Sequence, residues 1–428
     1  MSVYFILIAQ ISFYTLSKEY RIGITFLLLF SFVLKILFGF ITNTNAFKAL
    51  SHLDRLSEYD ATNYYLQSVY DIATQNTLIP ELHWSIADPG FSILLYWIGK
   101  IYVFFFDKYN ISYFHYIYFL IFMHTLIFLF IFNYLEKDQK LSKSLLVVFS
   151  LFVLFEPSML RFSFSLEREI LVSFFLLVFI TAFMDNKKIV MIISAFLLIQ
   201  FRDAYSYLLP TIMLSYFIFK RYFRTKRFLF LPILLIGFSL LVFILASNVQ
   251  AFEWLFFRHG KELGSSGFGD LILSSNYFTR VTIYSVLGFV APIPVYPFFN
   301  NDYSTFYLLG LILGLSSFSY ALLNSYIIFS FYQMDSLKSQ YSQSTYNWHV
   351  SSYKAYIVLF ILHLAFHGLI FNIRHRLQII PGLIFVFLFI VNSQQVSGMK
   401  TNLEKCFFAS ILVVVFINIL YFSLKIFL

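Results

Sequence analysis

Residues 113–134 read YFHYIYFLIFMHTLIFLFIFNY and contain no Asp, Glu, Lys or Arg. A helix that crosses a bilayer needs about 20 predominantly apolar residues, and this run supplies them. Comparable runs fill most of the 428 residues, so that 60% of the chain is hydrophobic, 12% is charged and the mean hydropathy is +0.79. Soluble globular proteins carry about 25% charged residues. We therefore expect an all-α, polytopic transmembrane helical bundle that forms one integral membrane domain over residues 1–428.

The same length criterion predicts about 11–14 membrane segments, some of them half-inserted. The candidates are residues 2–16, 22–41, 89–106, 113–134, 144–157, 169–184, 189–201, 204–219, 228–246, 281–299, 303–331, 355–371, 377–393 and 407–427. The larger polar segments are 42–88, 247–280, 332–354 and 394–406. The pattern indicates no separate soluble domain.

A net charge of +9 raises the question of nucleic acid as a partner. The only dense basic cluster is Lys220-Arg221-Tyr-Phe-Arg224-Thr-Lys226-Arg227, and it lies between two apolar runs. Such a position is typical of a cytoplasmic loop that follows the positive-inside rule, so nucleic acid is not expected. The single cysteine, Cys406, excludes an internal disulfide framework and a cysteine metal site.

Basic residues also predict the orientation of the chain in the membrane. Loops 17–21, 135–143, 185–188 and 220–227 are expected to be cytoplasmic. Segments 89–106 and 281–299 are expected to be half-inserted, because proline breaks helices and broken segments at membrane depth line cavities. The first opens with Asp88-Pro89-Gly90, and the second contains Pro292, Pro294 and Pro297.

With these two half-segments, the acidic and Arg-rich stretches share the outer face. The outer stretches are 42–88, 158–168, 202–203, 247–280 and 372–376, whereas 332–354 and 394–406 fall inside. In the rival topology residues 2–16 run outward and 42–88 faces the cytoplasm. That arrangement separates the first acidic loop from the arginines.

The first large loop carries three carboxylates within seven residues, Asp54, Glu58 and Asp60. Asp54 and Glu58 are four residues apart, so they would share one face of an amphipathic juxtamembrane helix. A carboxylate at the membrane surface can act as a general base on a sugar hydroxyl or hold a cation beside a phosphate. A solvated loop is the alternative interpretation.

Arginines flank several apolar runs. Arg168 lies between Glu167 and Glu169, with which it can pair, and it is also placed to bind a phosphate. Arg202 is followed by Asp203, so that a pair between these neighbours is the alternative to binding pyrophosphate, which a planar guanidinium suits. A last group, Arg374-His375-Arg376, opens an apolar helix and can hold a diphosphate with help from the helix N-terminal amides.

His363 and His367 are four residues apart, a spacing that superficially suits a metal. The sequence offers no Glu or third ligand at a sensible spacing, so no metal site is expected there.

The order of these motifs resembles bacterial membrane glycosyltransferases of the GT-C type, and also the Wzy and EpsG-like surface-polysaccharide polymerases. The motifs are Asp60-Ala-Thr-Asn-Tyr64, Asp88-Pro89-Gly90-Phe91, Leu166-Glu167-Arg168-Glu169-Ile170, Phe201-Arg202-Asp203-Ala204-Tyr205, Ala291-Pro292-Ile-Pro294 and Arg374-His375-Arg376-Leu-Gln378-Ile-Ile-Pro381. The resemblance covers most of the chain, although each motif is short. The chain lacks the doubled acidic pair that many such enzymes carry, and it lacks their C-terminal soluble domain.

The resemblance implies a GT-C-like bundle that transfers sugar from a polyprenyl-(pyro)phosphate at the outer face of the bacterial inner membrane. O-antigen or capsule repeat-unit polymerisation is the activity it favours. Asp60 would be the base or support it, with Asp54 and Glu58 in reserve. The phosphate-binding and substrate-binding residues would be Arg168, Arg202, Arg374, Arg376, His375 and Tyr64.

The expected partners are the lipid-linked glycan donor, a glycan acceptor, the lipid bilayer and a chain-length regulator protein. No cofactor follows from the motifs, and a divalent cation, Mg²⁺ or Mn²⁺, is the one candidate.

Two other functions fit the sequence. The first is a GT-C monosaccharide transferase that modifies lipid, glycan or protein. The second is a transporter or flippase for lipid-linked oligosaccharide, which predicts paired inverted repeats and charges at mid-membrane depth. The sequence pattern reveals neither of these features.

Overall fold

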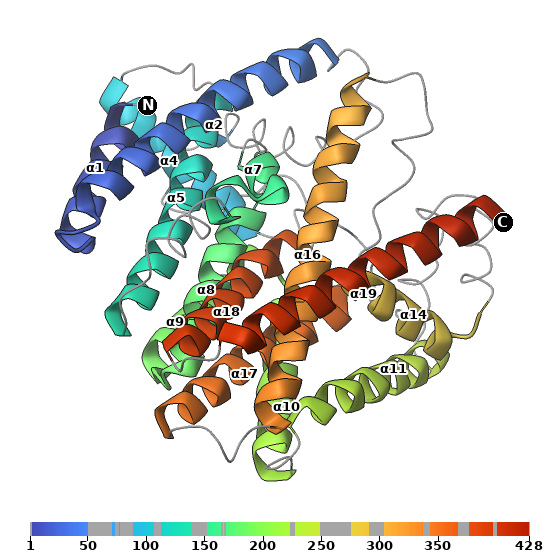
Figure 1. Cartoon of the computed structure of the whole chain (residues 1–428). Helices are drawn as coiled ribbons and strands as arrows, with labels where there is room; N and C mark the ends of the chain where they lie inside the picture. Colours follow the sequence, from blue (N-terminus) through green and yellow to red (C-terminus); the bar gives the residue numbers. More distant parts are fainter. Residues whose placement is uncertain are drawn as a thin grey trace. The chain divides into compact units, whose positions relative to one another are not determined.

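Every described element of the computed structural model is helical (Figure 1). The structure describes residues 2–49, 71–72, 77, 89–106, 113–138, 152–163, 166, 168–222, 227–248, 275–290, 304–336, 343–366, 376–396 and 400–427. The chain contacts group into two compact units, which are described separately below. The expectation of a single integral membrane domain stays a prediction.

Unit 1 comprises Met1–Phe179 and Ile189–Tyr205. Its helices are α1 (Ser2–Thr15), α2 (Arg21–Ala49), α4 (Pro89–Phe106), α5 (Tyr113–Asp138), α7 (Pro157–Phe162), most of α8 (Glu169–Met184) and α9 (Lys188–Phe201). Helices α1, α2 and α5 pack on one another. Large apolar side chains such as Leu28, Phe32 and Phe128 are fully buried among them.

Unit 2 comprises Ile180–Lys188 and Ser206–Leu428. Its helices are α10 (Tyr205–Tyr222), the 3₁₀ turn η2 (Arg227–Leu229), α11 (Phe230–Asn248), α14 (Tyr277–Val290), α16 (Ser304–Ser336), α17 (Gln343–His363), α18 (Arg376–Val396) and α19 (Lys400–Phe427). Helix α17 packs along α18, α16 packs against both α18 and α19, and α11 packs against α14.

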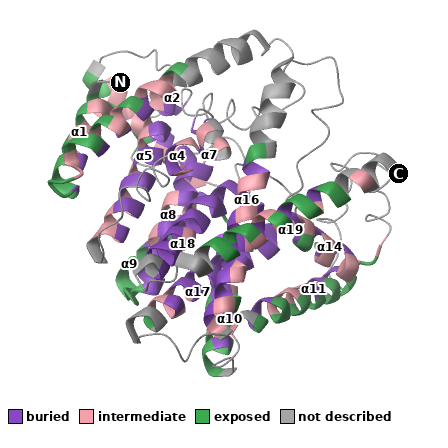
Figure 2. Cartoon of the chain, in the orientation of Figure 1, coloured by how far each residue is buried: buried purple, intermediate pink, exposed green. Residues whose placement is uncertain are grey.

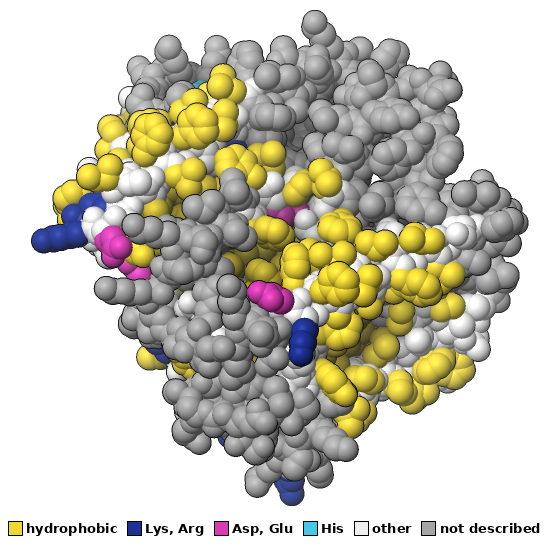
Figure 3. Space-filling view, in the orientation of Figure 1, with side chains coloured by type: hydrophobic (Ala, Val, Ile, Leu, Met, Phe, Trp, Pro, Cys, Tyr) yellow, Lys and Arg dark blue, Asp and Glu magenta, His cyan; other side chains and the backbone are white. Residues whose placement is uncertain are grey.

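The core of unit 2 lies in α17 and α18. Most described residues of these helices are buried, whereas exposed residues follow one side of α11 (Figure 2). The exposed side chains of α11 are themselves large and apolar, among them Ile233, Ile236 and Ile244. Hydrophobic side chains also dominate the described surface that Figure 3 shows. Such a surface is suited to lipid rather than to water.

Three described helices are long and apolar enough to cross a membrane: His115–Glu136 within α5, Phe230–Asn248, which is α11, and Asn347–Phe366, which covers most of α17. For the described residues, the prediction of an all-helical fold with helices long and apolar enough to cross a membrane is confirmed. The larger count of about 11–14 segments stays a prediction.

Several helix ends follow directly from the sequence. Pro89 and Pro157 are the first residues of α4 and α7, a position that needs no backbone N–H. The Glu156 carboxylate accepts a hydrogen bond of 2.8 Å from the backbone N–H of Met159 and so caps α7. Helix α8 ends at Met184. Two residues later Asn186 adopts a left-handed φ of 57°, and Lys187 N–H donates to the Ala182 carbonyl.

Helix boundaries depart from the predicted segments in several places. Helices α17 and α19 begin at Gln343 and Lys400, inside the polar segments 332–354 and 394–406. Helix α2 continues to Ala49, into the first expected outer loop, and α14 ends at Val290, before the three prolines. Hydropathy reports where a helix meets lipid, whereas backbone hydrogen bonds extend a helix through polar residues.

Segment 89–106 forms the unbroken helix α4 of 18 residues. The Asp88-Pro89-Gly90 motif therefore starts this helix and does not interrupt it. Half-insertion of this segment and of segment 281–299 stays a prediction.

Candidate functional site

Three of the predicted site residues are described, namely Arg168, Arg202 and Arg376. The others, Asp54, Glu58, Asp60, Tyr64, Arg374 and His375, lie outside the described residues. Arg168 and Arg202 belong to unit 1 and Arg376 to unit 2, so the site is built below as two separate clusters.

The cluster in unit 1 joins the end of α9 to the start of α8. Arg202 follows the last residue of α9, and its Nη1 lies 3.6 Å from Oε1 of Glu169, the first residue of α8. Both side chains are withdrawn from the surface, with exposures of 9% for Arg202 and 1% for Glu169. The sequence suggested Asp203 as the partner of Arg202. The structure gives Arg202 a buried ion pair with Glu169, and Asp203 is exposed.

Arg168 immediately precedes α8 and is half-buried. Its carbonyl accepts the first helical hydrogen bond, from Val172 N–H at 3.0 Å. Glu169, which the sequence offered as a partner for Arg168, forms its buried ion pair with Arg202. The junction of α8 and α9 thus contains two arginines and one fully buried carboxylate.

The cluster in unit 2 begins at Arg376, the first residue of α18, as the sequence predicted for an arginine at a helix start. Its side chain is buried, with 2% of the residue exposed. Nη1 of Arg376 donates a hydrogen bond of 2.8 Å to Oγ of Ser317 on α16. The guanidinium carbon lies 5.4 Å from the centroid of the Tyr320 ring, within cation–π range.

Tyr320 connects this arginine to a buried histidine. The Tyr320 hydroxyl lies 2.7 Å from Nδ1 of His363, and Nε2 of His363 lies 2.9 Å from the Ser285 carbonyl oxygen. Because a carbonyl only accepts, Nε2 carries the proton and Nδ1 accepts from the Tyr320 hydroxyl. Both ring nitrogens of His363 are therefore engaged in hydrogen bonds, which speaks against a role as a metal ligand.

The polar contacts continue along α16 and α17. The Asn324 amide donates to the Tyr320 carbonyl at 3.0 Å, and the Tyr356 hydroxyl donates to Asn324 Oδ1 at 2.9 Å. Sequence reasoning missed these residues. Ser317, Tyr320 and Asn324 are three and four residues apart, so they lie on one helix face, and this spacing was the signal that could have found them.

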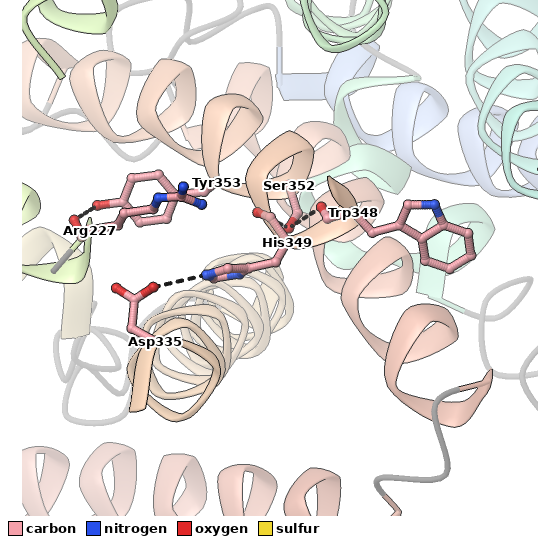
Figure 4. A network of polar contacts seen from close by, with 6 residues as sticks. All are labelled: Arg227, Asp335, Trp348, His349, Ser352 and Tyr353. Carbon is pink, nitrogen blue, oxygen red and sulfur yellow. Dashed lines mark hydrogen bonds and ion pairs between the residues drawn. The ribbon is translucent and has the colours of Figure 1, made fainter. Parts of the chain in front are cut away.

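A second polar network lies at the other end of α16 and α17 (Figure 4). Asp335 on α16 faces His349 on α17, with 3.1 Å between Oδ1 and Nε2. One turn along α17, the Tyr353 hydroxyl donates to the carbonyl of Arg227. This contact attaches the last residue of the basic segment 220–227 to α17, beside the Asp335–His349 pair.

The two networks are separated by nearly the thickness of a bilayer. Ser317 and Asp335 are both on α16, and the residues between them correspond to about 27 Å along the helix axis, against about 30 Å for a hydrocarbon core. The Arg376 end provides a buried guanidinium, a group suited to an anionic partner. The Asp335 end adjoins the basic segment that is expected to be cytoplasmic.

Comparisons with protein-family models, with curated proteins and with solved structures find no match to this chain. Within the described residues, no three His, Cys, Asp or Glu side chains are grouped as a metal ion would require.

Proposed function

We propose that the chain is a membrane glycosyltransferase that takes sugar from a polyprenyl-(pyro)phosphate donor at the outer face of the membrane. The specific activity that we favour is the polymerisation of polysaccharide repeat units. The observation that carries this proposal is the buried guanidinium of Arg376 at the start of α18, held by Ser317 and the Tyr320 ring. A planar guanidinium fixed in a poorly hydrated place is a strong partner for phosphate oxygens.

The contacts at the two ends of α16 support the assignment of Arg376 to the outer face of the membrane. Arg227 lies at the Asp335 end, and the positive-inside rule predicts that the basic segment 220–227, which ends at Arg227, is cytoplasmic. Arg376 binds Ser317, about 27 Å away along α16. Arg376 is then at the outer face, where a polyprenyl donor is used.

The proposed chemistry needs a base and a stabilised leaving group. A carboxylate, expected to be Asp60, takes the proton of the acceptor hydroxyl while the acceptor oxygen forms a bond to the anomeric carbon. The bond from that carbon to the phosphate oxygen breaks, and its electron pair leaves with the phosphate. Arg376 stabilises the charge that develops on the phosphate as it departs.

Arg202 supplies a second buried cation, in unit 1. Its pairing with Glu169 holds the guanidinium beside the start of α8. Arg168, half-buried beside it, adds further positive charge at the same junction.

One observation favours the transporter alternative. Lys35 lies well inside the predicted span 22–41 and is fully buried, as is His124 in the middle of 113–134. Charges at membrane depth are typical of transport pathways. The experiment below separates the two functions.

The proposal is tested in the native host, with variants replacing the chromosomal copy. We expect Asp60→Asn and Arg376→Gln each to abolish the ladder of polysaccharide chain lengths seen on a gel, because loss of one such group lowers the rate about 10²-fold or more. The amount of each variant protein in the membrane should stay normal. Arg221→Gln, at an exposed position of the basic segment, is the matched control and should keep the ladder.

Each alternative has its own result. Normal ladders in both Asp60→Asn and Arg376→Gln contradict the proposal. Loss of one sugar with unchanged chain length indicates a monosaccharide transferase. Accumulation of complete lipid-linked repeat units on the cytoplasmic leaflet indicates a transporter.

A further inference from the structure

Lys35 of α2 is a buried lysine for which the described residues provide no hydrogen-bond partner. It lies about four turns into α2, and none of its surface is exposed. Leu28 and Phe32, on neighbouring turns, are equally buried. An ammonium group in such surroundings is costly unless something neutralises it.

His124 of α5 presents a second nitrogen in the same region. It is fully buried, and Lys35 acts on it electrostatically across the α2–α5 contact. Nε2 lies 2.9 Å from the carbonyl oxygen of Val153, so Nε2 carries the proton. Nδ1 has no hydrogen-bond partner among the described residues.

Ser31 adds a hydroxyl to the same face of α2. It lies four residues before Lys35, and residues at this spacing are neighbours on a helix surface. Only 1% of Ser31 is exposed, and its Oγ finds no partner within the described part of the chain. Ser173 behaves differently, since it donates to the carbonyl four residues earlier, as helical serines commonly do.

Lys100 shows how a lysine of the same unit is ordinarily accommodated. It lies on α4, where its Nζ donates to the Ile72 carbonyl at 3.4 Å and stands 5.4 Å from the Tyr96 ring centroid. Among the described residues, Lys35 has neither kind of partner. This part of the structure therefore supplies no group that offsets the burial of the Lys35 ammonium.

We propose that Lys35, Ser31 and His124 form a binding site in unit 1 for a phosphate group. Lys35 and Ser31 together bring more hydrogen-bond donors than the site has acceptors, and a phosphate offers only acceptor oxygens and the missing negative charge. His124 Nδ1 accepts from Lys35 or from a protonated phosphate oxygen. Apolar neighbours such as Phe32 and Phe128 admit a phosphate that carries a lipid tail as well as a free one.

This site is independent of the proposed glycosyl transfer. None of its three residues belongs to the Arg376 or Arg202 clusters, and its test measures binding alone. Loss of the polymerase proposal would leave it standing, and the reverse also holds.

The test uses the full purified chain in phosphatidylcholine nanodiscs, with the thermal unfolding midpoint as the readout. Two probes are added separately, phosphatidate in the bilayer and inorganic phosphate in the buffer. We expect phosphatidate to raise the midpoint of the wild-type protein by about 2–4 °C or more. Lys35→Met should lose this rise, and Lys100→Met, the matched control, should keep it.

Ser31→Ala leaves Lys35 in place, and it is the variant to test if Lys35→Met does not fold. It removes one hydrogen bond to a charged group, so that phosphatidate affinity should fall about tenfold. A rise with inorganic phosphate as well as phosphatidate identifies the bare phosphate group as the ligand, whereas a rise with phosphatidate alone identifies the lipid form. An equal rise in wild type and Lys35→Met, or no rise with either probe, overturns the proposal.

Discussion

At the scale of single residues, three buried basic side chains, Arg202, Arg376 and Lys35, are accommodated in three different ways. Arg202 is neutralised by the carboxylate of Glu169. Arg376 is held by the Ser317 hydroxyl and the face of Tyr320. Lys35 finds no described partner. The cost of burying a charge falls with each hydrogen bond or opposite charge that the group gains. Among the described residues, Arg202 has an opposite charge, Arg376 has a hydrogen bond and an aromatic ring, and Lys35 has none of these.

Tyr320 is the residue on which the Arg376 cluster most depends. Tyr320→Phe keeps the ring beneath Arg376 but removes the hydroxyl that donates to Nδ1 of His363. Because that nitrogen is buried, losing its donor should cost about 1–3 kcal/mol of unfolding free energy. Thermal unfolding of the detergent-solubilised protein measures the change.

The matched control for this prediction is Tyr207→Phe in the same unit. Tyr207 is 79% exposed, so its variant should stay within about 0.5 kcal/mol of wild type. If both variants unfold like the wild type, the Tyr320–His363 hydrogen bond contributes no stability and the description of this cluster is wrong.

The sequence revealed some of these residues and concealed others for a physical reason. Arg202 and Arg376 stand at the ends of apolar runs, where a charge is visible against its surroundings. Lys35 and His124 stand inside such runs. The hydropathy of a run says how much of it is apolar, but it does not say toward which neighbour a single polar side chain points.

At the scale of helices, the close approach of α4 to α9 explains why glycine follows Pro89. A Cβ added to Gly90 would lie 2.6 Å from the carbonyl oxygen of Gln200 and 2.9 Å from its carbonyl carbon. Real Cβ atoms essentially never come so near to backbone atoms. The start of α4 can therefore rest against the end of α9 only with glycine at this position.

Gly90→Ala should consequently destabilise unit 1 by about 1–3 kcal/mol, since the backbone of α9 cannot move aside as a flexible side chain would. Gly23→Ala on α2 is the control. A Cβ there meets nothing within 4 Å, so the variant should be neutral or up to about 1 kcal/mol more stable, because alanine is the better helix former. Equal stability of the two variants in thermal unfolding would show that α4 and α9 do not approach as described.

Helix positions were predictable to the extent that lipid contact determines them. The predicted segment 169–184 coincides with α8, and 377–393 falls within α18. The beginning of α17 at Gln343 was not predictable, because Gln343, Ser344 and Asn347 satisfy their backbone in a helix without being apolar. Polar helix extensions of this kind carry no hydropathy signal.

At the scale of the whole chain, orientation in the membrane decides whether the predicted catalytic groups can meet. Within unit 2 the structure places Arg227 beside the Asp335–His349 pair, and Arg376 contacts α16 near Ser317, at the far end. In the predicted topology, loops 220–227 and 332–354 lie on one face of the membrane and 372–376 on the other. The loop that carries Asp60 lies outside the described residues, so its side of the membrane is the open question.

Cysteine labelling answers that question, because the only native cysteine, Cys406, is buried and can be replaced by serine. In a Cys406→Ser background, we expect Asp60→Cys and Arg374→Cys to react with a membrane-impermeant maleimide in intact spheroplasts. Arg221→Cys, in the basic segment, should react only after permeabilisation. If Asp60→Cys behaves like Arg221→Cys while Arg374→Cys reacts from outside, the base and the phosphate-binding arginines face opposite leaflets, and a single sugar-transfer site becomes physically impossible. If both react from outside, carboxylate and arginines share the compartment in which a lipid-linked sugar would be consumed.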